Sequence, residues 1–194
     1  MEKLNQAFWT QRYQEGTTGW DLGKPSPPLQ DYIDKLTNND LKILMPGAGN
    51  AHEVEYLWKK GFTHVTVMDI SPLPLENFKK RNPDFPESQM LLGDFFELDQ
   101  TFDLVIEQTF FCAIDRNLRM AYAKKMFDIL QPNGRLVGVL FGVEFDKPGP
   151  PFGGNKEEYL TYFEPYFKIE LMEVCKNSIP PRAGNELWIE MIRK

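Results

Sequence analysis

The stretch Leu41-Lys42-Ile43-Leu44-Met45-Pro46-Gly47-Ala48-Gly49-Asn50 decides the fold of this chain. It begins as a short apolar run, breaks at Pro46 and two glycines, and leads into a helical pattern that opens at Ala51. A buried strand that runs into a glycine turn and then a helix is how open α/β sheets hold nucleotide-like ligands. Glycine permits both the unusual backbone angles and the close ligand approach that such a turn requires. We therefore expect a ligand to bind over this turn.

The rest of the chain alternates short apolar runs with helical patterns, which is typical of a doubly wound α/β sheet. The last two apolar runs have only a loop between them, so we expect them to pair as an antiparallel hairpin. The predicted fold is a seven-stranded, mostly parallel sheet with helices on both faces. We expect strands at 41–45, 65–69, 89–92, 102–107, 135–141, 167–174 and 187–192, and helices at 4–13, 28–36, 51–60, 72–81, 117–130 and 156–163.

Length and composition predict one soluble domain over residues 1–194, in which residues 1–38 form an irregular cover over the ligand turn. The formal net charge of −6 argues against a nucleic-acid partner. No stretch is apolar for long enough to span a membrane, and no apolar signal core is present, so we expect a cytoplasmic protein. Cys112 and Cys175 have no metal-binding spacing, so we expect no metal. We expect a monomer or a weak homodimer.

Acidic residues follow the second and third predicted strands, at the edge where ligands bind to such sheets. Asp69 lies about twenty residues after the glycines, where a carboxylate accepts hydrogen bonds from a ribose. It can instead cap the helix that begins beside Ser71, whose own hydroxyl is also placed to cap. Asp94 can accept from an adenine amino group, and Phe95 either flanks the ring or packs in the core.

The identity of the nucleotide-like ligand follows from one crowded position and from nearby aromatic residues. A dinucleotide fingerprint needs a small residue three positions after Gly49, where His52 stands. S-adenosylmethionine has no pyrophosphate and fits the turn better. Its sulfonium is a cation, and aromatic faces attract cations within about 6 Å. Trp9, Tyr13 and Trp20 lie in the predicted cover and can supply such faces, although Trp9 and Tyr13 can also serve only to anchor their helix.

Several stretches, spread in order over nearly the whole chain, carry a family resemblance. They are Phe8-Trp9 with Trp20-Asp21-Leu22-Gly23, Met45-Pro46-Gly47-Ala48-Gly49, Asp69-Ile70-Ser71, Gly93-Asp94-Phe95-Phe96, Phe110-Phe111-Cys112-Ala113-Ile114 with Arg119, Pro148-Gly149-Pro150-Pro151-Phe152, and Ile179-Pro180-Pro181-Arg182. In these residues the chain resembles the thiopurine methyltransferase family of class I S-adenosylmethionine-dependent methyltransferases, and within it the plant-type thiol and halide methyltransferases. The resemblance implies a Rossmann-like fold, S-adenosylmethionine as cofactor and a small-molecule acceptor.

Together with the strand ends, the resemblance implies a set of site residues. The expected cofactor-binding residues are Trp9, Tyr13, Trp20, Gly47, Ala48, Gly49, Asp69, Ile70, Asp94, Phe95 and Gln108. The loop that contains Pro150, Pro151 and Phe152 is expected to close over the acceptor as a lid. Two positions depart from the thiopurine enzymes, which typically carry Arg in place of Gln108 and Trp in place of Tyr13. The run from Phe110 to Ile114 favours thiol or halide acceptors.

The chemistry of methyl transfer sets what the acceptor site must provide. When an anion attacks a sulfonium, the two charges are neutralised, so a dry, apolar pocket favours the reaction. The pocket must also hold the nucleophile and the methyl group in line at about 3–3.5 Å. Phe110, Phe111, Phe152 and Trp20 are candidate walls of that pocket. Glu107 and Gln108 are candidate acceptor-site residues, with Glu107 acting either as a base or only to orient its neighbours. A thiol or a halide ion needs little help from a base, whereas an alcohol or an amine needs more.

Three other functions remain compatible with the sequence. The first is methyl transfer to an oxygen, nitrogen or metalloid acceptor. The second is an NAD(P)-dependent reductase that uses the same glycine turn, against which His52 argues. The third is a non-catalytic module that binds S-adenosylmethionine, because a Rossmann-like fold does not imply catalysis.

Overall fold

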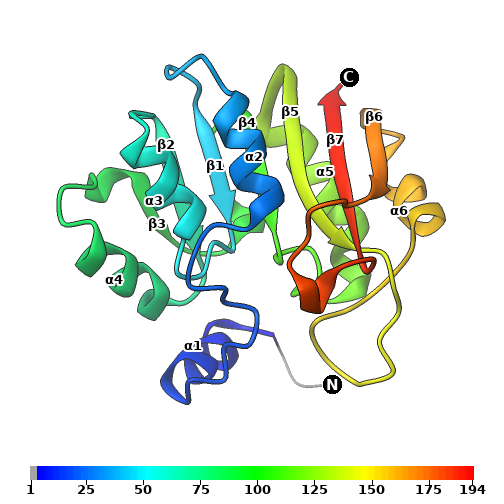
Figure 1. Cartoon of the computed structure of the whole chain (residues 1–194), viewed down its shortest axis with the longest axis horizontal. Coiled ribbons are helices and arrows are strands. Elements are labelled where there is room, and N and C mark those ends of the chain that lie inside the picture. Colours follow the sequence, from blue (N-terminus) through cyan, green and yellow to red (C-terminus); the bar gives the residue numbers. More distant parts are fainter. Residues whose placement is uncertain (1–3) are drawn as a thin grey trace.

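The centre of the protein is a seven-stranded sheet with the order β3-β2-β1-β4-β5-β7-β6 (Figure 1). The computed structural model describes residues 4–194. The strands are β1 (Ile43–Pro46), β2 (Val65–Asp69), β3 (Met90–Leu92), β4 (Phe102–Gln108), β5 (Leu130–Phe141), β6 (Phe167–Val174) and β7 (Glu186–Arg193). The first five strands run parallel, and β7 pairs antiparallel with both β5 and β6. The predicted fold class, including the antiparallel carboxyl-terminal pair, is confirmed.

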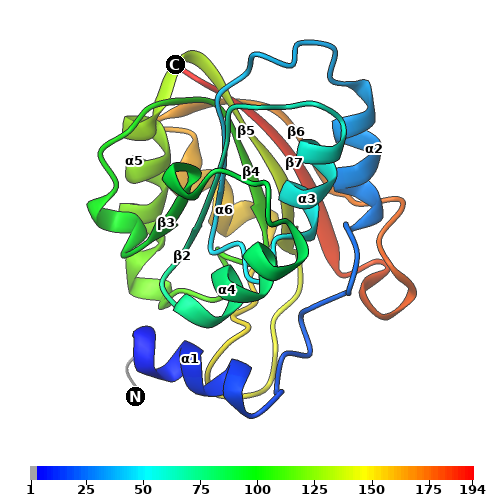
Figure 2. The ribbon, with the colours of Figure 1, turned by 90° about the vertical axis from the view of Figure 1, so that its left-hand side faces the viewer.

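Helices cover both faces of the sheet, as Figure 2 shows from the side. The helices are α1 (Gln6–Gln14), α2 (Pro27–Lys35), α3 (His52–Lys59), α4 (Pro72–Arg81), α5 (Arg119–Ile129) and α6 (Lys156–Phe163). Short 3₁₀ turns lie at η1 (Glu87–Gln89), η2 (Phe95–Glu97), η3 (Arg116–Leu118) and η4 (Pro180–Arg182). Among the described residues, no helix has the length and apolar character needed to cross a bilayer.

Each face of the sheet has its own apolar core, because the buried parallel strands alternate their side chains between two helical layers. One core joins Leu44 and Val105 to residues of α5 and α6. The other joins Ile43 and Ile106 to α2, α3 and α4. Helix α1 belongs to neither layer and lies beyond the carboxyl ends of the parallel strands, beside the loop of residues 142–155 (Figure 1).

Four local predictions are wrong in detail. The first strand begins at Ile43, two residues later than predicted, and β5 begins at Leu130 instead of residue 135. Helix α5 begins at Arg119, two residues later than predicted, because residues 116–118 form the 3₁₀ turn η3. The expected cap near residue 115 is present at the start of that turn, where the side chain of Asp115 accepts a hydrogen bond from the amide of Asn117. Ser71 precedes α4 without capping it, because its hydroxyl is hydrogen-bonded to that of Thr10 at 2.9 Å.

Candidate functional site

A cavity of about 1300 Å³ lies at the carboxyl ends of the parallel strands, between α1 and the 142–155 loop. It exceeds the 300–1,000 Å³ of a pocket that holds one drug-sized ligand. We call the part formed by the cover and the ends of β1 to β3 the cofactor half; its lining includes Trp9, Tyr13, Trp20, Gly47, Asp69, Ile70, Asp94 and Phe95. We call the part formed beyond β4 and β5 the acceptor half; its lining includes Phe110, Cys112, Phe141, Phe145, Pro150 and Pro151.

The glycine turn after β1 is as tight as its sequence predicts. Gly47 and Gly49 both have positive φ angles, of 56° and 54°. A Cβ atom on Gly47 would lie 2.2 Å from Cδ2 of Phe110, so the Phe110 ring packs directly on the turn. A Cβ on Gly49 would lie 2.8 Å from the Tyr13 hydroxyl. Only Gly47 lines the cavity, whereas Ala48 is buried in the core and Gly49 supports the turn beneath the cover.

Asp69 holds the turn and still has capacity for a ligand. Its Oδ2 accepts a hydrogen bond from the Gly49 amide at 2.9 Å, and its Oδ1 accepts one from the Ser71 amide at 2.8 Å. Burial raises the pKa of this carboxyl group. Asp69 also lines the cavity, and a carboxylate has about four lone-pair sites, so it can still accept a hydrogen bond from a ligand. Asp69 therefore connects the turn to the ligand space and also holds the backbone before α4, which combines the two roles left open by the sequence.

The other acidic residue of the cofactor half lies at the end of β3. Oδ1 of Asp94 accepts a hydrogen bond from the Phe96 amide at 2.9 Å, which fixes the turn η2. Phe95 is buried, yet it lines the cavity and packs edge-to-face on Phe110 with ring centroids 5.2 Å apart. An acidic side chain beside an aromatic ring suits an adenine, because it can accept from the amino group.

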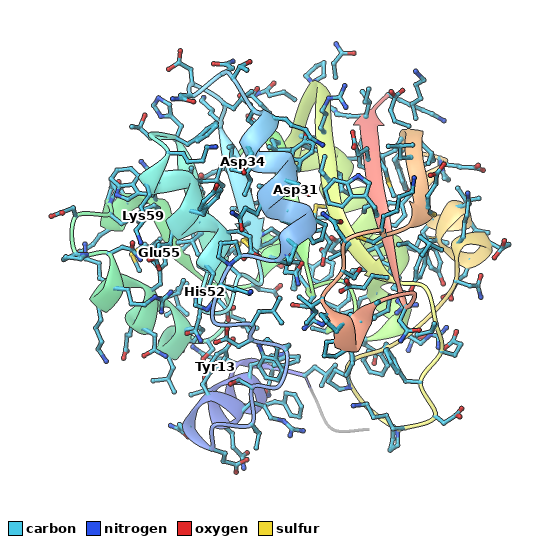
Figure 3. All side chains as sticks on the ribbon, in the orientation of Figure 1. Tyr13, Asp31, Asp34, His52, Glu55 and Lys59 are labelled. Atoms are coloured by element: carbon cyan, nitrogen blue, oxygen red, sulfur yellow. The ribbon has the colours of Figure 1, made fainter. Side chains whose placement is uncertain are left out.

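The aromatic residues of the cover form one cluster against the cavity. The Trp20 ring lies edge-to-face with both Trp9 and Tyr13, at centroid distances of 5.6 and 5.8 Å. Figure 3 shows Tyr13 on α1, below the start of α3, where His52 lies. Burial raises the pKa of Tyr13, so its hydroxyl stays neutral. The labelled acids and lysine of α2 and α3 lie farther from α1, on the outer side of the fold (Figure 3).

Polar contacts hold the cover in place at several points. Asp21 pairs with His52 at 2.8 Å and also accepts from Asn50, and hydrogen bonds from these partners lower its pKa. On the other side, Nη2 of Arg182 donates to the Trp20 carbonyl at 2.9 Å. His52 is therefore occupied by the cover and is not a wall of the cavity.

Two predicted site residues at the end of β4 have other roles. Gln108 is buried and accepts a hydrogen bond from the Ser26 hydroxyl at 3.2 Å, so it secures the cover and does not line the cavity. Glu107 is fully buried. Its Oε1 accepts from the Phe110 and Phe111 amides at 2.8 and 2.9 Å, and Oε2 accepts from the Tyr122 hydroxyl. Burial raises the pKa of Glu107 to about 7.

The Glu107 contacts decide which way the next side chains point. They hold a turn in which Thr109 has a φ of 58°, a strained conformation for a β-branched residue. Phe110 then faces the cavity, whereas Phe111 points into the core against Tyr159. Phe111 is thus not a wall of this cavity, and Glu107 orients the wall without contacting the ligand space.

The expected lid divides in a similar way. Pro150 and Pro151 line the acceptor half, whereas Phe152 does not. The Phe152 amide instead donates to the Cys112 carbonyl at 2.7 Å, which anchors the end of the loop. Cys112 lines the cavity with a neutral thiol, because burial raises its pKa to about 12.

Sequence reasoning assigned no role to two cations that line the acceptor half, Arg182 and Lys147. Arg182 is 9% exposed and pairs with Glu186 at 3.5 Å. It lies in Ile179-Pro180-Pro181-Arg182, one of the stretches that carry the family resemblance, and that match is the sequence signal that points to it. Among residues 4–194, no group of three or more histidine, cysteine or acidic side chains is arranged to hold a metal ion.

The cofactor half fits S-adenosylmethionine by the chemistry of its side chains. Asp69 and Asp94 supply acceptors for hydroxyl and amino groups, and the Trp9, Tyr13 and Trp20 cluster supplies aromatic rings for a cation. The approach of Tyr13 to Gly49 leaves no room for a larger residue at the turn. The acceptor half of the cavity leaves room for a second, smaller molecule.

Comparisons with known proteins agree with this assignment. The sequence profile described as thiopurine S-methyltransferase matches residues 4–190. A probable thiol methyltransferase 2 of Arabidopsis thaliana is 30% identical over 193 residues, which cover 96% of this chain and 84% of the relative. A thiopurine S-methyltransferase of Acinetobacter baylyi is 24% identical, over 96% of this chain and 98% of the relative.

The fold has solved counterparts as well. A Burkholderia thailandensis 1,6-didemethyltoxoflavin-N1-methyltransferase, crystallised with S-adenosylhomocysteine, superposes with a TM-score of 0.75 at 18% identity. The match covers 97% of this chain and 86% of that one. A TehB-like methyltransferase of Corynebacterium glutamicum superposes with a TM-score of 0.67 at 20% identity, over 97% of this chain and 98% of that one.

Proposed function

Because the chain belongs to the thiopurine S-methyltransferase family and is an S-adenosylmethionine-dependent methyltransferase, we propose that its acceptor is a small sulfur nucleophile that reacts as an anion. Small thiols and sulfide are the first candidates. Thiocyanate and halide ions come next, since a thiocyanate methyltransferase 1 of Brassica oleracea is also among the relatives. An NAD(P)-dependent reductase and a non-catalytic module fit the family less well.

The observation that carries this proposal is the make-up of the acceptor half. Aromatic, aliphatic, proline and thiol groups form most of its walls, and the charged side chains among them are two cations, Arg182 and Lys147, and one carboxylate, Asp115. An apolar pocket with cationic side chains attracts a small anion and leaves it weakly solvated, which favours its attack on a cation. Asp69 and Asp94 belong to the cofactor half, away from these walls.

The state of the polar groups also favours an acceptor that ionises by itself. Among the described residues, no histidine lines the cavity. The thiol of Cys112 is neutral at physiological pH, and both oxygens of Glu107 are occupied in the core. An alcohol or an amine would need a base to remove its proton, whereas a thiol that ionises in water needs none.

The residues of this chain would divide the work as follows. Bound S-adenosylmethionine supplies an electrophilic methyl group on its sulfonium. Asp69, Asp94 and the aromatic cover hold it and shield it from water. Phe110, whose ring packs against the glycine turn, supplies an apolar wall between the two halves of the cavity. Arg182 attracts the anion and, through the Trp20 carbonyl, connects the acceptor half to the cover.

An acceptor panel tests this proposal. S-adenosylhomocysteine formation would be measured with sulfide, small thiols, aromatic thiols, iodide, thiocyanate, a thiopurine, and alcohol and amine controls. We expect turnover with thiols or sulfide and none with alcohols or amines. Arg182→Gln should raise the KM for an anionic acceptor by about tenfold, since it removes a buried charge. Turnover of the alcohols or amines, or of no sulfur acceptor, would contradict the proposal.

The proposal also covers the domain organisation, the cellular location and the oligomeric state. Residues 1–194 act as one methyltransferase domain, and residues 1–38 act as its cover, although the first three residues lie outside the described part of the chain. The protein works in the cytoplasm as a monomer or weak homodimer, without nucleic acid or membrane partners. Light scattering after size-exclusion chromatography tests the oligomeric state, and a stable higher oligomer would contradict it.

A further inference from the structure

Arg12 is a cation of the cover that lines the cavity beside the aromatic cluster. It lies in the last turn of α1 and is half-buried. Its Cζ lies 4.9 Å from the centroid of the Phe8 ring, and that ring packs edge-to-face on Trp9 with centroids 5.0 Å apart. The stack therefore holds the guanidinium next to the rings that face the ligand space.

The guanidinium of Arg12 has no partner of its own in the part of the chain that the structure describes. Among residues 4–194, it makes no hydrogen bond and no ion pair. The polar contacts of Arg12 are made by its backbone carbonyl, which accepts from the amide and the hydroxyl of Thr17 at 2.9 and 3.3 Å. A cation that lines a cavity without a counter-charge is available to an anionic group of a ligand.

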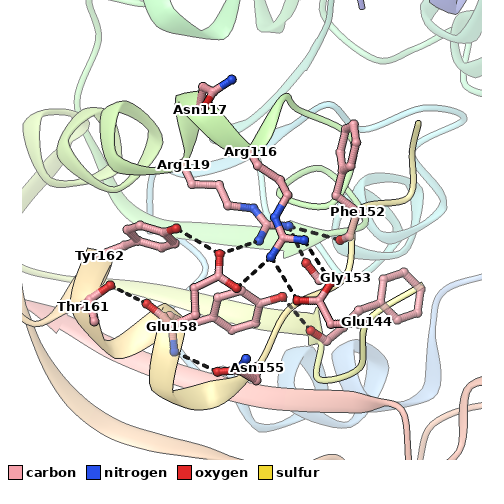
Figure 4. A network of polar contacts seen from close by, with 12 residues as sticks. Arg116, Asn117, Arg119, Glu144, Phe152, Gly153, Asn155, Glu158, Thr161 and Tyr162 are labelled. Carbon is pink, nitrogen blue, oxygen red and sulfur yellow. Dashed lines mark hydrogen bonds and ion pairs between the residues drawn. The ribbon is translucent and has the colours of Figure 1, made fainter. Parts of the chain in front are cut away.

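Other arginines of the chain differ from Arg12 because protein groups hold them. Arg116 and Arg119 both pair with Glu158, each at 3.1 Å (Figure 4). Arg182, which lines the acceptor half, donates to the Trp20 carbonyl. Arg12 thus keeps its donors for a ligand, whereas these three arginines use theirs within the protein.

The glycine turn offers few donors to an anion, although turns of this kind often bind anions through their amides. The Gly49 amide donates to Asp69 at 2.9 Å. The amides of Ala48 and Ala51 donate to the carbonyls of Met68 and Ala48, at 3.0 and 2.9 Å. Because three amides of the turn are already bonded, an anionic group of the ligand needs a donor from the cover.

The two ends of S-adenosylmethionine differ in the partners that they need. The adenosine end carries hydroxyl and amino groups, for which Asp69 and Asp94 are acceptors. The amino-acid end carries a carboxylate, which a short carbon chain joins to the sulfonium. A carboxylate that leaves water needs a charged or hydrogen-bonded partner, and the planar fork of a guanidinium matches its two oxygens. Arg12 lies on the same helix as the aromatic residues proposed to hold the sulfonium.

We propose that Arg12 binds the carboxylate at the amino-acid end of S-adenosylmethionine, stacked on Phe8 so that its fork faces the cavity. The proposal concerns the cofactor and does not depend on which acceptor the enzyme uses. Its consequence is that the contribution of Arg12 to affinity is present only for ligands that carry this carboxylate.

Calorimetry with two ligands tests the proposal. One is S-adenosylmethionine, and the other is decarboxylated S-adenosylmethionine, which keeps the adenosine, the sulfonium and the amino group. We expect Arg12→Gln to raise the Kd of S-adenosylmethionine by about tenfold or more. The Kd of the decarboxylated ligand should change by less than about twofold, because the missing carboxylate and the missing cation belong to one interaction.

Lys24→Gln is the matched control. It also removes a cation from the cover, but Lys24 is exposed and does not line the cavity. The control should change neither Kd. Arg12→Lys keeps the charge and removes the fork, so it should weaken binding of S-adenosylmethionine by about threefold, and it replaces Arg12→Gln should that variant fail to fold.

Three results would overturn the proposal. An equal loss of affinity for both ligands would show that Arg12 only stabilises the end of α1, where a cation is favourable. Wild-type affinity for S-adenosylmethionine in Arg12→Gln would show that no carboxylate binds there. A raised acceptor KM with an unchanged cofactor Kd would assign Arg12 to the acceptor. If the wild type methylates no sulfur acceptor, the proposed function fails, and the calorimetry still decides the role of Arg12.

Discussion

Replacing Gly47 by alanine tests the glycine turn, because the structure shows two separate costs at this position. The first is the φ angle of 56°, which an L-residue adopts at a cost of about 1–2 kcal/mol. The second is the new Cβ, which would lie 2.2 Å from the Phe110 ring. Forcing such overlap costs about 1–3 kcal/mol. We therefore expect Gly47→Ala to lower the free energy of unfolding by about 2–5 kcal/mol in total.

Gly16→Ala is the matched control for this prediction. Gly16 has a φ of 66°, but a Cβ there would meet no atom within 4 Å. It should cost only the backbone strain of about 1–2 kcal/mol. Urea unfolding measures both variants, and calorimetry measures their affinity for S-adenosylmethionine. Gly47→Ala should weaken that affinity by about tenfold or more, or about 1.4 kcal/mol, since the Phe110 ring must move within the cavity. Equal stability of the two variants, or wild-type cofactor affinity in Gly47→Ala, would refute the reasoning.

Two further predictions concern the end of β4. Glu107 keeps its proton to a higher pH in the folded protein, with a pKa of about 7, than in the unfolded chain, so its contribution to stability is greatest at low pH. As pH rises from about 4.5 to 7, the free energy of unfolding of the wild type should fall by about 3 kcal/mol relative to that of Glu107→Gln. Urea unfolding measures both proteins, and a difference between them that stays constant with pH would contradict this prediction. Gln108→Arg should destabilise the protein by at least about 2 kcal/mol, because it buries a cation where Ser26 now donates. It should not create thiopurine methylation, and a gain of that activity would contradict the placement of Gln108 outside the cavity.

The parts of the fold that follow from local sequence were predictable. The apolar run, the glycine turn and the spacing of Asp69 each depend on neighbouring residues, and β2 has the bounds that its sequence predicts, residues 65–69. The order of strands around β7 was not predictable in the same way. Its insertion between β5 and β6 depends on long-range pairing, for which a single sequence carries no direct signal.

The site was predictable at the level of segments and less so at the level of single side chains. Phe110 and Phe111 are consecutive and chemically alike, and only the hydrogen bonds to Glu107 decide that one faces the cavity and the other the core. Gln108 points toward the cover for a similar reason, since Ser26 is brought beside it from a distant part of the chain. Contacts of this kind exist only after the chain has folded.

The dependence of kcat/KM on pH for a series of thiols tests the central claim most directly. If the protein binds the acceptor as an anion and supplies no base, the midpoint of each profile should follow the solution pKa of the thiol used, and a halide should show no such midpoint. Thiols whose pKa values differ by about two units should give midpoints that differ by about two units. A single midpoint shared by all thiols would show that a group of the protein removes the proton, and it would contradict the account.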